Sequence, residues 1–128
     1  MPTFFWIGVG GAVGTMARYW LSGVVAHRFG ETFPMGTLVV NVSGSFVIGL
    51  FATLTDPDGR WFVGSEWRQF FMIGVLGGYT TFSSFSLQTL SLARDGEWLW
   101  AGMNVVASVM ICLAAVWVGH ALAININK

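Results

Sequence analysis

The sequence predicts an all-α integral membrane protein that crosses the bilayer four times. Hydrophobic residues make up 55% of the 128 residues and charged residues only 9%, whereas soluble domains carry about 25% charged residues. Four stretches contain no Asp, Glu, Lys or Arg, and each is at least 17 residues long, which is within the range of about 17 to 25 residues that span a bilayer as a helix. These stretches are Met1–Ala17, Thr32–Thr55, Gln69–Ala93 and Trp98–Asn127. We therefore expect one transmembrane domain over residues 1–128, with helices near 4–26, 35–54, 62–93 and 98–122.

Composition narrows the range of functions. The net charge of zero argues against a nucleic-acid partner, which would require a basic surface. The N-terminus has no basic region before its apolar run, so we expect no cleaved signal peptide. Cys112 is the single cysteine, which excludes an internal disulfide and a zinc cluster within the chain, and a buried packing thiol is its expected role.

The positive charges in the loops are almost balanced across the membrane. Four spans place both termini and the loop around residues 56–68 on one side. That side carries the three basic residues Arg60, Arg68 and Lys128. The opposite side carries Arg28 and Arg94, together with Arg18 if its side chain snorkels that way. Orientation normally follows an excess of Lys and Arg in cytoplasmic loops. The weak bias suits a chain that inserts in both orientations and forms an antiparallel homodimer, although a weak bias that insertion still resolves fits equally well.

The first helix carries a pair of glycines and one charge. Gly10 and Gly14 form a G-x-x-x-G pair, which allows two helix backbones to approach closely. Arg18 lies about 21 Å along the helix from residue 4 by helical rise. A charge at that depth is costly unless it faces water or a partner. Arg18 is therefore either a residue that attracts anions at a vestibule or an interfacial arginine that snorkels to the surface.

The third span contains a stretch, residues 74–91, that predicts a broken helix. Gly77 and Gly78 are poor helix formers, and Tyr79, Thr80 and Thr81 add side chains that favour extended structure. Irregular backbone at membrane depth is tolerated only where it is buried in protein or lines a watery cavity. We expect a break near Gly77–Thr81, although a glycine-rich kink with Ser and Thr bonded back to the helix is the alternative.

Three helices each carry a stripe of polar but uncharged residues. After the break, Phe82 and Phe85 share one face at a spacing of three. The stripes, read at helical spacing, are Asn41, Ser45 and Gly49 in the second span, Thr81, Ser84, Gln88 and Ser91 in the third, and Asn104, Ser108 and Cys112 in the fourth. One such stripe is ordinary packing. Three stripes beside a pair of rings indicate a shared lining for an ion path.

These segments resemble one known family. The motifs GGAVGTMARY, GTLVVNVSGSF and GGYTTFSSFS are similar to those of the Fluc fluoride channel family, also called CrcB. The similarity extends over the whole chain in length, number of spans and order of motifs. It implies a passive, fluoride-selective channel in the bacterial inner membrane that exports cytoplasmic fluoride through two pores of a dual-topology antiparallel homodimer. It also implies one structural sodium ion at the centre of the dimer.

The resemblance implies a role for individual residues. Backbone carbonyls of Gly77 and Thr80 would hold the sodium ion, and the ring edges of Phe82 and Phe85 would face fluoride. Asn41 would be an amide donor in the pore, and Arg18 would lie in the vestibule. The remaining expected pore residues are Thr81, Ser84, Gln88 and Ser108, with Cys112 as a further lining position in the fourth helix. Gln88 departs from the family, because many members have glutamate there.

Other classes of function fit the sequence less well. A small dual-topology transporter of the multidrug-efflux kind also uses four short helices, but proton coupling requires a carboxylate within the membrane. Every Asp and Glu in this chain falls in or beside a loop. We do not expect an enzyme, because no His/Asp/Ser constellation or metal-ligand cluster is present. A non-transporting assembly protein would show an intact dimer without ion flux.

Overall fold

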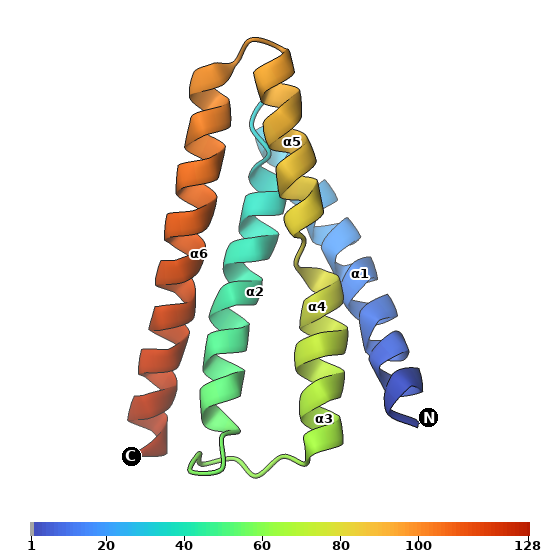
Figure 1. The fold of residues 1–128 in the computed structure, drawn as a ribbon, viewed down its shortest axis with the longest axis vertical. Helices are drawn as coiled ribbons and strands as arrows, with labels where there is room; N and C mark the ends of the chain where they lie inside the picture. Colours follow the sequence, from blue (N-terminus) through green and yellow to red (C-terminus); the bar gives the residue numbers. More distant parts are fainter. Residues whose placement is uncertain (1) are drawn as a thin grey trace.

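The structure, a computed structural model, describes residues 2–128, and helices are the only regular secondary structure in that range. Four long helical rods run alternately up and down, and the third rod is built of four consecutive segments (Figure 1). Both termini and the 55–64 loop lie at one end of the molecule (Figure 1). The elements are α1 (Pro2–Phe29), α2 (Met35–Leu54), α3 (Ser65–Gln69), the π-helical turn η1 (Phe70–Val75), α4 (Leu76–Tyr79), α5 (Phe82–Arg94) and α6 (Trp98–Asn127).

Three of the rods in the described part of the chain are long and apolar enough to cross a membrane. They are Met35–Leu54, the composite rod Ser65–Arg94 and Trp98–Asn127. The first rod, α1, is 28 residues long but does not reach the same hydropathy, since Arg18 and several glycines lower its average. The expectation of four long helices therefore holds, whereas composition and length support three of them as spans.

The rods end close to where the sequence predicts, and two of them run further. The first helix continues to Phe29, where Gly30 adopts a left-handed conformation with φ of 82° and so ends it at little steric cost. The last helix continues to Asn127. At the far end, Gly96 with φ of 80° forms the tight turn between α5 and α6.

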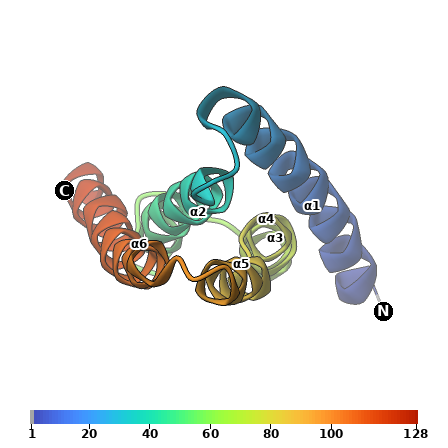
Figure 2. The same ribbon diagram turned by 90° about the horizontal axis from the view of Figure 1, so that it is seen from above.

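The other helices pack on both sides of the broken third rod. In the view from above, α2 lies beside α6, and α1 stands obliquely on the other side of the third rod (Figure 2). The first part of that rod, η1 and α4, contacts α1, whereas α5 contacts α6. Few large apolar side chains are fully buried, and most of the aromatic and aliphatic side chains are exposed. Lipid and further protein are the surroundings that such a surface requires.

Glycines allow α1 to approach the third rod at backbone distance. A Cβ atom added at Gly10 would lie 2.8 Å from the carbonyl oxygen of Phe70, and one at Gly14 would overlap the carbonyl oxygen of Val75. A Cβ atom at Gly78 would lie 2.5 Å from the carbonyl oxygen of Gly11. The G-x-x-x-G pair therefore makes the close helix contact that its spacing predicts.

Arg68 connects the end of α2 to the start of the third rod. Its Nε donates to Thr55 Oγ1 at 2.8 Å, and its Nη2 donates to the carbonyl of Ala52 at 3.1 Å and to Asp56 at 3.4 Å. A guanidinium beside the last carbonyls of a helix also complements the negative end of its dipole. The interfacial end of the bundle is thus held by a charged contact.

Candidate functional site: a pocket at the helix break

The third rod breaks at two threonines. Thr80 has φ −85° and ψ 159°, and Thr81 has φ −154° and ψ 117°, so both are extended between α4 and α5. The break lies within the expected stretch Gly77–Thr81, but Gly77 and Gly78 themselves are helical. Gly78 serves the close contact with α1 instead. The β-favouring threonines, rather than the glycines, occupy the irregular backbone.

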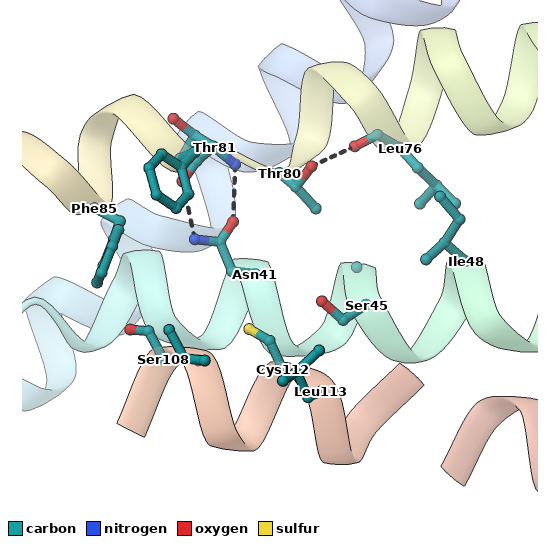
Figure 3. A pocket seen from close by; sticks show the side chains of 13 residues that line it. Asn41, Ser45, Ile48, Leu76, Thr80, Thr81, Phe85, Ser108, Cys112 and Leu113 are labelled. Carbon is teal, nitrogen blue, oxygen red and sulfur yellow. Dashed lines mark hydrogen bonds between the residues drawn. The ribbon is translucent and has the colours of Figure 1, made fainter. Parts of the chain in front are cut away.

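Asn41 pairs with both backbone polar groups of Thr81. The Thr81 N–H donates to Asn41 Oδ1 at 2.8 Å, and Asn41 Nδ2 donates to the Thr81 carbonyl at 2.9 Å (Figure 3). A backbone N–H and C=O without partners at membrane depth would each cost several kcal/mol. One side chain of α2 therefore compensates the groups that the break exposes, and one amide N–H of Asn41 remains beyond this pair.

Hydroxyl groups complete the hydrogen bonding around the break. Thr80 Oγ1 donates to the carbonyl of Leu76 at 3.0 Å. Thr81 is the N-cap of α5, and its Oγ1 accepts from the N–H of Ser84 at 3.2 Å. Such a cap satisfies one of the free N–H groups in the first helical turn. The break is thus a built feature with a defined partner for each of these groups.

A pocket of about 410 Å³ opens beside the break. Four helical elements contribute to it: α2, α4, α5 and α6, together with the extended pair (Figure 3). No ionisable carboxylate or cation lines it. The lining residues are Asn41, Gly44, Ser45, Ile48, Leu76, Thr80, Thr81, Phe82, Phe85, Ser108, Val109, Cys112 and Leu113. Five of the expected pore residues therefore come together here, namely Asn41, Thr81, Phe82, Phe85 and Ser108.

The two rings lie side by side but differ in burial. Their centroids are 5.3 Å apart, with an interplanar angle of 58°. Phe85 is 8% exposed, whereas Phe82 is 76% exposed. The edge of an aromatic ring carries partial positive charge, while its face is negative. An anion beside these rings is stabilised only where it meets an edge.

Ser108 belongs to a polar network between α5 and α6. Its Oγ donates to Asn104 Oδ1 at 3.4 Å, and Asn104 Nδ2 donates to Thr89 Oγ1 at 2.9 Å. Thr89 in turn donates to the carbonyl of Phe85 at 2.8 Å. Asn104 is 2% exposed, so its amide requires these partners. The stripe in the fourth helix is therefore partly packing and partly pocket lining.

Two of the expected pore residues lie outside this pocket. Ser84 does not line it and bonds to Thr81, from which its Oγ accepts at 3.1 Å. Gln88 faces a second cavity of about 480 Å³ among α1, α2, α5 and the 30–34 loop. Its Oε1 is buried, and within residues 2–128 it has no hydrogen-bond partner. The polar stripe of the third span thus divides between two cavities.

Arg18 lies against the third rod near the break. It is half-buried, and its Nε donates to the carbonyl of Gly78 at 3.1 Å. Thr15 Oγ1 is 3.5 Å from the same carbonyl. The position of Arg18 therefore matches neither an arginine that snorkels fully to the surface nor one that is free in solution. Its charge is placed about one turn before the extended pair.

Sequence patterns missed one small residue that positions the break. Gly44 is buried, and a Cβ atom added there would overlap the methyl group of Thr80 and lie 3.2 Å from the ring of Tyr79. Only glycine permits this approach of α2 to the extended pair. The signal available in the sequence was its spacing of three residues from Asn41, on the same face of α2.

Backbone carbonyls are the oxygen ligands that this region offers to a cation. Among residues 2–128 no group of three or more His, Cys, Asp or Glu side chains could hold a metal ion. In an unbroken helix the carbonyl of Gly77 would accept from the Thr81 N–H, and that of Thr80 from the Ser84 N–H. Both N–H groups donate to side chains instead. The break therefore removes the helical donors of both carbonyls expected to bind sodium, as it does for the neighbouring carbonyls at the end of α4, and backbone carbonyls fit the oxygen-ligand preference of a hard cation.

Long apolar helices and an uncharged, ring-lined pocket at a helix break define a multi-pass membrane protein of the ion-channel class. The model of the CrcB family, described as "CrcB-like protein, Camphor Resistance (CrcB)", matches residues 5–120. The chain belongs to this family.

Three relatives that share one name with each other are similar to this chain over nearly its whole length. It is 62% identical over 126 residues to the "Fluoride-specific ion channel FluC" of Rhodospirillum rubrum, with 98% of each chain covered. The FluC of Opitutus terrae is 61% identical over all of this chain and 97% of its own length, and that of Paramagnetospirillum magneticum is 62% identical over the full length of both. These relatives are ion channels and not enzymes, and the chain is a multi-pass protein of the bacterial inner membrane.

Proposed function

We propose that the protein is a passive, fluoride-selective channel that exports cytoplasmic fluoride. The observation that carries the proposal is the pocket at the break, where Phe82 and Phe85 meet the remaining amide N–H of Asn41 and the uncharged polar side chain of Ser108. The names of the relatives, which cover the chain end to end, support fluoride as the ion.

The chemistry of the pocket suits a small anion. Fluoride holds its water strongly, and moving a bare ion into a medium of low dielectric costs many kcal/mol. Neutral hydroxyl and amide donors replace that water without trapping the ion, as fixed cations would. Ring edges add partial positive charge. An inside-negative potential of 100 mV contributes ~2.3 kcal/mol toward the export of each ion, so no pump is needed.

The second copy of an antiparallel homodimer completes the pathway. Phe82 is largely exposed in one chain, and Ser83 and Ser86 lie exposed on the same membrane-spanning helix. Hydroxyls are poorly placed against lipid, and a ring that contacts the ion must face a pore. A second chain in the opposite orientation covers these side chains and forms two equivalent pores. The nearly balanced loop charges agree with insertion in both orientations.

One structural sodium ion lies at the centre of the proposed dimer. Gly77 is exposed in the single chain, and its carbonyl and that of Thr80 are without their helical donors, so equivalent carbonyls of two chains can share one ion. A resident sodium ion supplies positive potential beside the pores. The residues Asn41 and Thr81 hold the backbone that presents these carbonyls.

Ion efflux from liposomes tests the proposal. Purified protein is reconstituted into vesicles loaded with fluoride or with chloride, and efflux is followed with ion-selective electrodes after a potassium ionophore removes the electrical limit. We expect rapid fluoride efflux and chloride efflux no faster than in protein-free vesicles. Equal rates for the two halides would contradict fluoride selectivity, and no flux of either ion from an intact dimer would contradict a channel.

A further inference from the structure

Asn41 acts on the backbone of the break at least as directly as it acts on the pocket. Its Oδ1 and Nδ2 atoms both form hydrogen bonds with the backbone of Thr81, at 2.8 and 2.9 Å. The pair resembles the two-bond exchange between neighbouring strands, and it locks one residue of extended backbone onto α2. In the same helix, Gly44 receives the methyl group of Thr80, so α2 fixes both residues of the break.

The bond to the Thr81 N–H has a consequence for Gly77. A helix that continued through Thr81 would use this N–H to close a bond to the Gly77 carbonyl. Asn41 Oδ1 takes the N–H, and the Gly77 carbonyl is left with the capacity to bind another group. The pocket residue and the cation ligand are thus linked through one backbone N–H, although Asn41 itself has no contact with that carbonyl.

We propose that Asn41 is a positioning residue that keeps the helix open and thereby couples the fluoride pocket to the cation site. This inference rests on the proposed function for the identity of the cation. Without the Asn41 amide, the Thr81 N–H alternates between water, where it exchanges, and the Gly77 carbonyl, which it then withholds from sodium. Sodium binding then weakens even though no sodium ligand has been changed.

Two substitutions separate the roles of the two amide atoms. Asn41→Leu keeps a similar volume but removes both hydrogen bonds to Thr81. Asn41→Asp keeps an oxygen that accepts from the Thr81 N–H, so it leaves the Gly77 carbonyl free, while it removes the amide donor. Ser45→Ala is the matched control, because Ser45 lies one turn further along α2 and lines the same pocket without a hydrogen bond to the break.

The readouts do not depend on fluoride flux. Thermal unfolding of the purified dimer is measured while sodium chloride replaces choline chloride at constant ionic strength, and hydrogen–deuterium exchange is measured in peptides that cover residues 76–85. For Asn41→Leu we expect the half-saturating sodium concentration and the exchange rate at Thr81 each to rise roughly tenfold. Asn41→Asp and Ser45→Ala should keep both values near those of the unchanged protein.

Several outcomes would overturn the inference. Wild-type sodium response and exchange in Asn41→Leu would leave Asn41 only a donor to the anion, and equal losses in Asn41→Leu and Ser45→Ala would indicate a general loss of packing. If Asn41→Leu does not assemble, Asn41→Ala decides the question by the same two readouts. A wild-type dimer without any response to sodium would refute the sodium site and the coupling, whereas the exchange at Thr81 would still decide whether Asn41 holds the break.

Discussion

The two halves of the broken rod pack in opposite ways. Before the break, η1 and α4 meet α1 through backbone atoms, at glycines that admit no side chain. After it, α5 meets α6 through side chains, with Thr89 bonded to Asn104 and Phe85 buried. The third span therefore serves two purposes. Its first half fixes the fold by close contact, and its second half is free to present rings and hydroxyls to a pocket.

The largest expected effect comes from filling the glycine contact. In Gly14→Val the new side chain overlaps the Val75 carbonyl, and backbone at a helix contact moves less readily than a side chain. We expect a loss of about 3 kcal/mol of stability or failure to assemble. Folded yield and thermal unfolding in detergent measure it. Gly23→Val is the control, since a Cβ atom there meets nothing within 4 Å, and equal damage from both would refute the scaffold role of the first half.

Substitution of the rings tests the second half. Phe85→Ile and Phe82→Ile both remove the polarised ring edge and keep an apolar side chain. Each should lower fluoride efflux from liposomes by roughly tenfold. Phe85→Ile should also lower stability, since Phe85 is buried and Phe82 is exposed. Size-exclusion chromatography checks that the proposed dimer still forms, and full efflux from the double variant would reduce both rings to packing.

The smallest effect is expected at Gln88. Its Oε1 is buried without a partner among residues 2–128 and faces the second cavity rather than the pocket. Gln88→Leu removes an unsatisfied acceptor, so stability should rise by about 1 kcal/mol, with fluoride efflux almost unchanged. A severe loss of efflux from a stable dimer would place the ion path through the second cavity instead.

Residue patterns predict the helices of this molecule better than the contacts between them. Charge-free windows place the long helices, and the threonines and glycines near residue 80 predict the break, because both signals are local. The contacts that shape the break are not local. Gly78 packs on α1, Gly44 admits Thr80, and Asn41 binds Thr81, and each of these contacts joins helices distant in the sequence.

The same limit applies to the pocket. Helical spacing groups Ser84 and Gln88 with Thr81, because it registers the face of one helix but not which neighbour covers it. In the structure Ser84 bonds to Thr81 beside the break, and Gln88 faces a second cavity. For the lone thiol, the general expectation was packing and the family resemblance implied a lining position, and Cys112 lines the pocket with Ser108.

Modification of Cys112 during transport tests most directly whether the pocket is the ion path. It is the single cysteine of the chain, so a small methanethiosulfonate reagent reacts at one known place. We predict that fluoride efflux from liposomes stops as the thiol reacts, while a Cys112→Ser protein conducts fluoride and ignores the reagent. Undiminished efflux from protein that mass spectrometry shows to be completely modified would contradict the account.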